Sequence, residues 1–365
     1  MSSTLLDVRA AFGEIARLGA ITRFRPGTWT LDGGHLQGVG AVDERTLALS
    51  ASSKAEATVA FVEWADRIGF GTGTSIGHVV VGDRTLHHAG GLQIADDVLA
   101  VGVEAGEVRS RVVFLDVADA NAPSLIDHLA FERPGPGQAP ENKRWTAGAV
   151  GLTRRGHGYL LVVGSWDSAQ LDFYESTGGA SDGGELRDPG CSFRHVSAWD
   201  SDGADRTGWK DGNYGAYQSV NLIMSTTGGV FFVAGNRNRS GEDWIDLFSV
   251  DLSDPAAPRV AKEDKRHLTC RDDASFRWAG GLVVDGEDLH AIAAEKNLHS
   301  LTTVNAFIGG GGLRFVVNRR SGVVHSLLDP CPYVGRMSAA NRVPTDDASE
   351  GSEWCDYCFP ERADG

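Results

Sequence analysis

The sequence predicts an all-β fold, a single β-propeller of five blades of four-stranded antiparallel sheets, with a short N-terminal helix. From about residue 28 onward, short apolar runs alternate with turns rich in Gly, Asp and Asn, which indicates strands. A two-strand unit that opens on small residues recurs, as in AGGLQIADDVLAVGVE (89–104) and AGGLVVDGEDLHAIAAE (279–295). Gly38 and Gly91 open two first strands, and Asp66 and Asp119 end the matching third strands, with 53 residues between each pair.

Three further two-strand units complete the set. A single blade cannot bury both of its faces, so the blades must stack and the ring must close. Five blades is the prediction and six the alternative. The further units are QGVGAVDERTLALSAS (37–52), AGAVGLTRRGHGYLLVVGS (147–165) and QSVNLIMSTTGGVFFVAGN (218–236). Third strands are expected at 169–176, 243–252 and 301–309, and fourth strands at 124–131, 191–199 and 259–270.

The two ends of the ring are expected to meet. Residues 310–329 would supply the fourth strand of the last blade, with TWTL at 28–31 tying the ends together. The segment KAEATVAFVEWADRI (54–68) also fits a helical pattern, and only the repeat register favours a strand there.

The first segment predicts a helix. Thr4 can cap it, with Asp7 three residues on, and Gly19 stops it. Its apolar face is Leu5, Val8, Phe12, Ile15 and Ala16. The chain therefore divides into a helix and lead-in (1–27), a propeller (28–330) and a C-terminal tail packed on or trailing from the propeller (331–365).

Composition narrows the partners. The formal net charge of −15 at pH 7 makes the chain acidic and disfavours nucleic acid and anionic membranes. We find no apolar run long enough for a membrane span and no secretory signal pattern at the N-terminus, so a cytoplasmic location is expected. A small-molecule ligand is the expected partner, and a protein partner stays open.

The cysteines cluster at the end of the chain. Cys331, Cys355 and Cys358 fall in the last 35 residues, and Cys355-x-x-Cys358 has the spacing of half a zinc site that His325 or Cys270 would complete. Only one such pair exists, and the preceding DDASEGSE has the composition of a flexible segment. Reduced thiols or a disulfide are therefore favoured over structural zinc at Cys355 and Cys358.

The stretch HHAGGLQ (87–93) carries a resemblance. An H-x-G-G-[LI]-Q pattern heading a blade resembles the LVIVD-type and related bacterial β-propellers. The resemblance covers roughly residues 28–330 and implies the propeller architecture, with no catalytic residue attached to it.

Propeller topology places candidate site residues on one face. Loops that lead into a first strand and loops that leave a second strand emerge on the same side of the ring. Candidate catalytic residues there are His35, His88, Glu104 and Glu295, and candidate substrate-binding residues are Trp166, Asp167, Asn236, Arg237, Trp278 and Lys296. Long crossings at 132–145 and 176–217 are expected to reach this face, and the second carries Trp199, Trp209 and Tyr214, as expected of a lid.

Structural roles compete with functional ones. The glycines of HHAGGLQ are expected to let first strands crowd at the axis. His88 with Glu104 fits a structural hydrogen bond as well as a working pair, and Glu295 with Lys296 would also suit the wall of a wet channel. GGGG at 309–312 opens no predicted helix, and G-x-S-x-G and H-E-x-x-H are absent from the sequence.

Two functions follow. The first is a small-molecule hydrolase or lyase, in which His88 or His35 acts as general base and Glu104 or Glu295 orients it. Glu104, Glu295 and His88 would also be the candidate ligands of a Mg²⁺ or Ca²⁺ ion, by analogy with streptogramin lyases and propeller lactonases. The second is a non-catalytic propeller that binds a ligand or a protein through its tryptophans. The enzyme is the favoured hypothesis.

Overall fold

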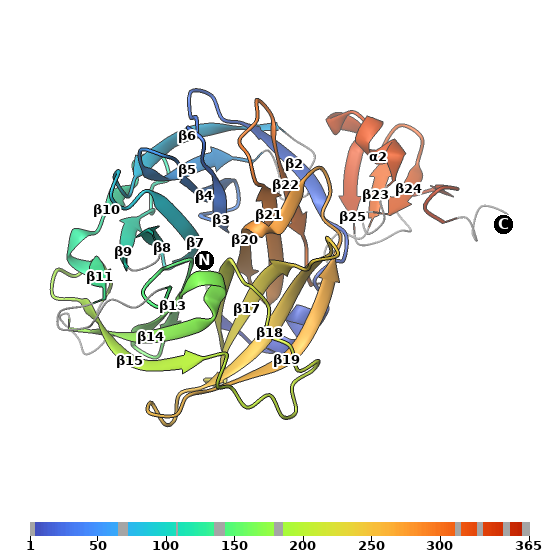
Figure 1. The fold of residues 1–365 in the computed structure, drawn as a ribbon. Coiled ribbons are helices and arrows are strands. Elements are labelled where there is room, and N and C mark those ends of the chain that lie inside the picture. The colour runs from blue at the N-terminus through green and yellow to red at the C-terminus, as the bar shows by residue number, and fades with distance from the viewer. Residues whose placement is uncertain are drawn as a thin grey trace.

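Five antiparallel sheets surround a central axis in the computed structural model, which describes residues 4–64, 72–106, 109–134, 143–178, 185–310, 315–326, 331–345 and 351–359 (Figure 1). The inner strands contact one another in ring order, and the last contacts the first. The fold is therefore the predicted five-bladed propeller.

Each blade runs outward from the axis in sequence order. Blade 1 is β3 (His35–Ala41), β4 (Thr46–Ser52), β5 (Ala57–Glu63) and β6 (Thr72–Val80). Blade 2 is β7 (His88–Ala95), β8 (Val98–Ala105) and β9 (Arg109–Asp116), edged by two short strands, β10 (Ser124–Leu125) and β11 (Phe131–Arg133). Blade 3 is β12 (Ala149–Arg155), β13 (Gly158–Gly164), β14 (Gln170–Thr177) and β15 (Ser192–Asp200).

Blade 4 is β16 (Ser219–Ser225), β17 (Val230–Arg237), β18 (Asp243–Asp251) and β19 (Arg259–Leu268). Blade 5 is β20 (Ala274–Asp285), β21 (Asp288–Glu295) and β22 (Thr302–Phe307), and its fourth strand is β2 (Ala20–Arg25) from the N-terminal segment. The expectation that residues 310–329 would form this strand is wrong. The segment at 54–68, whose pattern also fits a helix, contains strand β5, as predicted from the repeat register.

Ring closure uses backbone pairing at both edges of blade 5. β2 pairs antiparallel with β22 and also parallel with β6 of blade 1, while Gly280 of β20 pairs with Gly38 of β3. One N-terminal strand therefore completes the last blade and joins it to the first. The closure removes two exposed strand edges, which would otherwise be open to pairing with another chain.

Middle strands of each blade are buried on both faces. All seven residues of β4 are buried, and their side chains alternate between two neighbours. Leu47 and Leu49 belong to the core shared with blade 5, whereas Ala48 belongs to the core shared with blade 2. This two-sided burial explains why these strands appear in the sequence as continuous apolar runs instead of alternating patterns.

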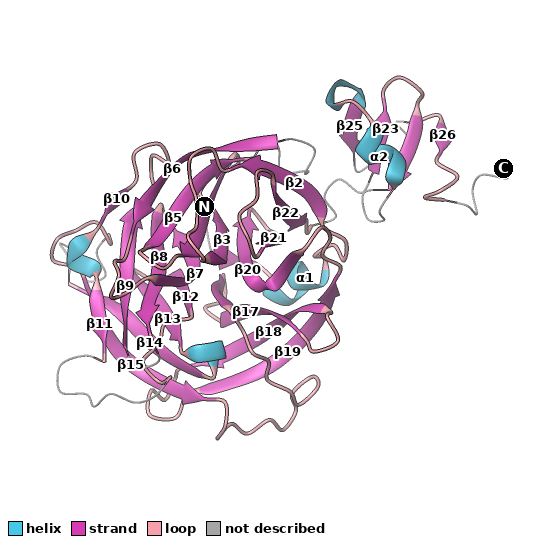
Figure 2. Cartoon of the chain, turned by 45° about the horizontal axis from the view of Figure 1, so that its top comes forward, coloured by secondary structure: helices cyan, strands magenta, loops and turns pink. Residues whose placement is uncertain are grey.

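The N-terminal helix is shorter than predicted. Thr4 and Leu5 form a short strand, β1, that pairs with β16, and α1 (Val8–Gly13) begins after Asp7, whose side chain caps the Ala10 N–H at 3.0 Å. The predicted apolar face is nevertheless buried between blades 4 and 5, at the end of the ring where β16 finishes. Its members there are Leu5, Val8, Phe12 and Ile15. Figure 2 shows how few and short the helices are.

Inner strands approach one another closely at the axis. A Cβ on Gly281 would overlap the main-chain oxygen of Val39 in the neighbouring blade, and one on Gly90 would lie 2.6 Å from the Gly148 oxygen. The Gln93 amide bonds to the inner strands of two other blades. Nε2 donates to the Leu222 oxygen at 2.7 Å, and Oε1 accepts from Leu152 N at 2.9 Å and Leu222 N at 2.7 Å. One side chain of blade 2 thus ties blades 3 and 4 together.

A small sheet follows the propeller, and we call residues 315–359 the C-terminal unit. It contains β23 (Phe315–Asn318), β24 (Val323–Ser326), β25 (Arg342–Thr345) and β26 (Glu353–Trp354), with helix α2 (Pro332–Arg336) beside them. Its hydrophobic cluster is separate from those of the blades.

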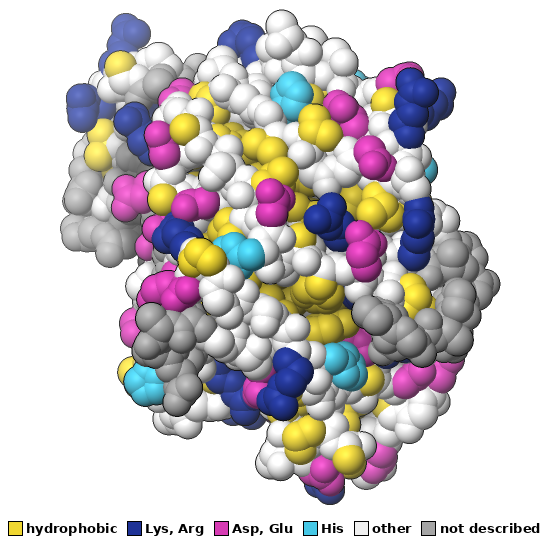
Figure 3. All heavy atoms as spheres, turned by 90° about the vertical axis from the view of Figure 1, so that its left-hand side faces the viewer, with side chains coloured by type: hydrophobic (Ala, Val, Ile, Leu, Met, Phe, Trp, Pro, Cys, Tyr) yellow, Lys and Arg dark blue, Asp and Glu magenta, His cyan; other side chains and the backbone are white. Residues whose placement is uncertain are grey.

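The outer surface mixes charges of both signs. Figure 3 shows the side of the molecule that carries β10 and β11, where acidic and basic side chains are interspersed with small apolar areas. Among the described helices, none has the length and apolar character to cross a membrane.

Gly281→Ala should destabilise the ring, because the added methyl group forces two inner strands apart. We expect a loss of about 3 kcal/mol in the free energy of unfolding, measured by urea denaturation. Gly77→Ala is the matched control, since Gly77 also lies in a strand but, apart from its own chain neighbours, no atom of the described residues lies within 4 Å of the position that its methyl group would take. The control should stay within about 0.5 kcal/mol of wild type. Equal effects of the two substitutions would contradict the close approach at the axis.

Candidate functional site

Backbone bulges distinguish the inner strands of blades 1, 2 and 5 at one face of the ring, which we call the axial face. In β3 the extra residue is Gln37, and in β7 it is the pair Gly90–Gly91. In β20 the register shifts between Ala274 and Ala279. Bulges re-aim side chains and are frequent beside active sites. The two glycines that follow the histidines in the sequence are therefore the bulge of β7.

A cluster of polar side chains lies at these bulges, and we call it the histidine cluster: His35, Gln37, Ser52, His88 and Glu104. The Gln37 amide nitrogen bonds to Nε2 of His35 and lies 2.7 Å from Nε2 of His88. The two imidazole rings are 5.4 Å apart between centroids. Residues from strands β3, β4, β7 and β8 therefore converge as the repeat register predicts for His35, His88 and Glu104.

Glu104 is buried and both of its oxygens are engaged. Oε2 accepts a hydrogen bond from Ala147 N at 2.6 Å, and Oε1 lies 3.2 Å from Nδ1 of His88. The contact with His88 is close enough for an ion pair but is not aligned as a hydrogen bond. The carboxylate thus anchors the lead-in to blade 3 and faces the imidazole of blade 2.

Protonation follows from these partners. An amide nitrogen only donates, so Nε2 of each ring accepts from Gln37, and each neutral ring carries its proton on Nδ1. For His35, Nδ1 then faces Ser52 Oγ at 3.2 Å. Burial, with the nearby charges of His88 and Lys296, lowers the pKa of His35 to about 4. His35 is therefore neutral at pH 7.

Aromatic and cationic side chains border the histidine cluster. Trp278 meets the His35 ring edge-on, with centroids 5.6 Å apart, and the Lys296 ammonium lies 3.9 Å from the centre of the indole. Lys296 has no ion-pair partner among the residues that the structure describes. Arg277 also lies near Trp278, but its guanidinium pairs with Asp167 at 2.9 Å.

The other predicted residues have different contacts. Asp167 is held by Arg277 and by Gln218 Nε2 at 2.7 Å, which links blades 3, 4 and 5. Arg237 pairs with Asp243 at 3.2 Å, and Glu295 faces Thr303 and the His299 ring, 3.7 Å away. Within the described part of the chain, no hydrogen bond or ion pair joins Arg237 or Glu295 to the histidine cluster, although we expected both to converge there.

Glu295 faces Thr303 on the next strand of its own blade, β22, and His299 in the loop before that strand. Burial raises its pKa, against hydrogen bonds from Thr303. Trp166 is 40% exposed and stacks under the Lys143 ammonium, and Asn236 lies at the end of β17 opposite Trp244. These four predicted residues, Glu295, Arg237, Trp166 and Asn236, form the rim and not the cluster.

The predicted aromatic lid is wrong for the aromatic side chains that we named. Trp199, Trp209 and Tyr214 pack together in the hydrophobic core between blades 3 and 4, and the last two contact Phe248. The segment 201–217 runs along blade 4, where Lys210 N donates to the Lys262 oxygen at 3.1 Å. Residues 135–142 and 179–184, within the two long crossings, lie outside the described residues.

Gln37, Arg277 and Gln218 are site residues that the sequence alone did not predict. Gln37 and Arg277 sit in bulges, and a bulge reverses the expected in–out alternation of a strand without leaving a clear pattern in the sequence. The available signal for Gln37 was the sequence HLQ at 35–37, which places a second polar side chain two residues after His35.

A second buried charge cluster lies between blades 2 and 3. The Asp172 carboxylate bonds to the guanidiniums of Arg133 and Arg144, and Nε2 of His195 lies 3.0 Å from it. Burial alone would raise the pKa of Asp172, but these hydrogen bonds and charges hold it below its ordinary value. Both guanidiniums also lie against the Trp145 ring. With Arg133 and Asp172 almost fully buried, this cluster is a structural link between blades.

Metal binding at the axial face is not supported by a full set of ligands. His88 and Glu104 offer two donors that face each other, and their outer atoms are taken by Gln37 and Ala147. Among the described residues, the group of three or more potential ligands lies instead in the C-terminal unit. A Mg²⁺ or Ca²⁺ ion at the axial face stays a prediction.

Comparisons with known proteins place no family on the chain. No protein-family model matches it, and no curated protein matches it. Among solved structures, it is similar to a GH32 beta-fructofuranosidase from Bombyx mori, with 12% identity, a TM-score of 0.41, and 80% of this chain and 60% of that chain covered. The chain thus spans less than two thirds of the length of that enzyme.

Two other solved structures are similar, also at low identity. One is an alpha-L-arabinofuranosidase from Podospora anserina in complex with cellotriose, with 10% identity, a TM-score of 0.42, and 81% of this chain and 98% of that chain covered. The other is a GH43 protein from Bacillus licheniformis, with 9% identity, a TM-score of 0.29, and 76% and 72% covered. Likeness this distant assigns no activity or substrate to the chain, and the propeller rests on its own strand pairing.

Lowering the pH should destabilise the fold partly through His35. Its pKa of about 4 in the folded chain is below the ordinary value of 6.5, so the unfolded chain binds more protons between these values. The free energy of unfolding should therefore fall as the pH drops from 6.5 to 4. His35→Gln should reduce this fall by about 1 kcal/mol, since the ring is partly exposed and solvent screens part of the effect. Urea denaturation at pH 7 and pH 4.5 tests this, and identical pH slopes for both proteins would refute it.

Proposed function

We propose that the axial face is the active site of a hydrolase that acts on a small organic anion, with His88 and Glu104 as its acid–base pair. The observation that carries the proposal is the 3.2 Å approach of a buried carboxylate to Nδ1 of a partly exposed imidazole. A carboxylate in this position orients a histidine base and stabilises the imidazolium that forms when the base takes a proton. The distance is within hydrogen-bond reach, and the proposal requires the contact to align as a hydrogen bond in the working state.

The chemistry would proceed through His88 Nε2. This nitrogen takes a proton from water, the hydroxide adds to the substrate carbonyl carbon, and the carbonyl π electrons move to oxygen. The imidazolium then returns the proton to the leaving group as the bond to it breaks. Nε2 must first exchange its hydrogen bond with Gln37 for one with water, and the neutral His35 leaves the Gln37 amide a second partner during this exchange.

Lys296 indicates the charge of the substrate. Its ammonium lies over Trp278 beside His35, without an ion-pair partner among the described residues. It would hold a carboxylate of the substrate or a developing oxyanion, while the indole supplies an apolar wall. In the lyase version of this proposal, the same base would remove a proton from carbon instead of from water.

A non-catalytic binding site is the second candidate, and one observation favours it. Gln37 occupies Nε2 of both histidines, which makes the cluster a closed hydrogen-bond network in this state. A ligand would then bind against Trp278 and Lys296 without any proton transfer. The resemblance to LVIVD-type propellers is compatible with either candidate.

Glu104→Gln should abolish turnover while the fold survives, because the amide oxygen can still accept from Ala147 N but the charge facing His88 is gone. We expect kcat to fall about 100-fold or more, with the melting temperature within a few degrees of wild type. His88→Ala should have the same effect. Activity is to be screened on p-nitrophenyl acetate, p-nitrophenyl hemisuccinate, δ-valerolactone and p-nitrophenyl glycosides. A variant that unfolds would make the pair structural, and a wild-type chain inactive on all four classes would favour the binding site.

Lys296→Met should weaken binding of anionic ligands selectively, since methionine keeps the apolar stem over Trp278 and removes the charge. We expect KM for the hemisuccinate ester to rise about 10-fold, with little change for the uncharged acetate ester. Lys265→Met is the matched control, because Lys265, on the outer strand β19, also lies over a tryptophan, Trp244, at 4.3 Å, but pairs with Asp211. Equal loss in both variants, or equal loss for both esters, would contradict the role of Lys296.

A further inference from the structure

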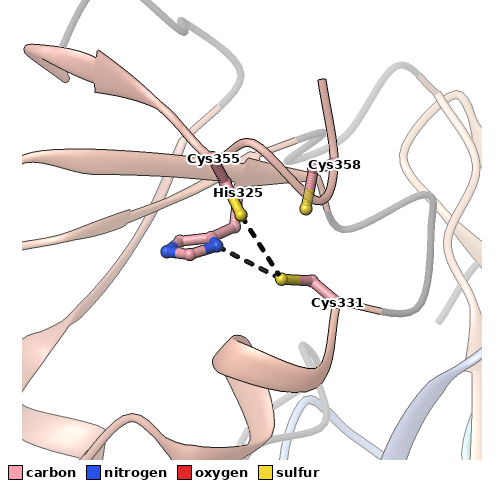
Figure 4. A group of neighbouring side chains, drawn as sticks. All are labelled: His325, Cys331, Cys355 and Cys358. Carbon is pink, nitrogen blue, oxygen red and sulfur yellow. Dashed lines mark hydrogen bonds between the residues drawn. The ribbon is translucent and has the colours of Figure 1, made fainter. Parts of the chain in front are cut away.

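Four potential metal ligands meet in the C-terminal unit: His325, Cys331, Cys355 and Cys358. They come from three separate segments. His325 lies on β24, Cys331 immediately precedes α2, and the Cys355–Cys358 pair follows β26 (Figure 4). Figure 4 shows the imidazole and the three thiols directed toward one common point.

Local backbone structure explains how the pair is presented. Cys355 N donates to the Val324 oxygen at 2.9 Å, which fixes the first thiol beside the strand that carries His325. The chain then turns back, because Cys358 N and Phe359 N both donate to the Cys355 oxygen, at 3.0 and 2.9 Å. This tight turn brings the thiol of Cys358 onto the same side as that of Cys355, which is the arrangement that C-x-x-C zinc ligands require.

The distances fit a tetrahedral metal. The four ligand atoms lie within 4.8 Å of one another. Cys331 Sγ is 3.9 Å from Cys355 Sγ and 3.2 Å from Nδ1 of His325. Tetrahedral bonds of about 2.3 Å to sulfur and about 2.0 Å to nitrogen would place such atoms about 3.5–3.8 Å apart. A small contraction or expansion of each pair would suffice to accommodate the ion.

The unit needs such a link to hold together. Its hydrophobic cluster consists of Val316, Cys331, Val334, Met337 and Cys355, with Val323 and Cys358 at its edge, so three of its seven members are thiols. A unit of about 45 residues whose described residues form so small an apolar core is usually stabilised by a disulfide or a metal. All five cysteines of the chain are free, and three thiols with one imidazole leave one sulfur unpaired in any disulfide scheme within the cluster.

We propose that this cluster is a structural zinc site of the Cys₃His type. On binding, the three thiols lose their protons to solvent and the sulfurs bond to Zn²⁺. The neutral His325 ring binds through the lone pair of Nδ1, the nitrogen that faces Cys331. Three soft thiolates and an imidazole, all buried or partly buried, select zinc over Mg²⁺ or Ca²⁺. Four protein ligands leave no open position for catalysis. The sequence offered His325 or Cys270 to complete the half-site of Cys355 and Cys358, and it favoured reduced thiols or a disulfide. In the folded chain His325, and not Cys270, lies with Cys331, Cys355 and Cys358.

The test is metal content and coordination of the full-length chain. Protein purified under reducing conditions should contain one zinc per chain by mass spectrometry, and cobalt substitution should give the thiolate charge-transfer and d–d absorption bands of a tetrahedral Cys₃His site. Cys331→Ser and Cys355→Ser should lose zinc and the cobalt spectrum.

Cys191→Ser and Cys270→Ser are the matched controls, because both residues are free cysteines of the propeller. They should retain zinc and the cobalt bands. Wild-type protein without zinc that also gives no cobalt bands would overturn the proposal, and so would loss of metal in the control variants. If the cluster variants fail to fold, the cobalt titration of the wild-type chain decides alone.

Discussion

The close approach of five inner strands at the ring axis is the constraint on which the rest of the structure depends. A side chain at Gly281 would overlap Val39 of the next blade, and the Gln93 amide is hydrogen-bonded to the backbones of blades 3 and 4. The inner strands can keep this close approach only over part of their length. At the axial face β3 and β20 carry bulges near their first residues, and these bulges direct Gln37 and the Arg277–Trp278 segment toward the candidate site.

Closure of the ring therefore also assembles the candidate site. Strand β2 joins blade 5 to blade 1, which brings Lys296 and Trp278 beside His35, far from them in the sequence. Glu104 then ties the second blade to the third through Ala147 N while facing His88. The Glu104 carboxylate thus has a structural role at the lead-in to blade 3 and a chemical role beside His88. Glutamine at this position keeps an acceptor for Ala147 N and removes the charge, so it tests the chemical role separately from the structural one.

Sequence reasoning reached the repeat and the convergence of His35, His88 and Glu104, because strand spacing and register carry that information directly. It missed β2 as the closing strand, since a single edge strand of six residues has no repeat to mark it. It placed Arg237 and Glu295 at the cluster because they stand at matching or adjacent repeat positions. In the structure both side chains instead contact residues of their own blades: Arg237 pairs with Asp243, and Glu295 faces Thr303 and His299. It left the choice between His325 and Cys270 as completing ligand open, because only the pairing of β24 with β26 brings His325 beside the C-x-x-C pair.

Recognition of a small organic anion at Trp278 and Lys296, within reach of His88, is the central claim for the axial face. A crystallographic fragment screen with small carboxylates, esters and lactones tests it most directly. We expect a carboxylate bound by the Lys296 ammonium against the indole, with the remainder of the fragment directed toward Nε2 of His88. Fragments bound only at other surfaces, with the Gln37 bridge between the histidines unchanged in every structure, would contradict it.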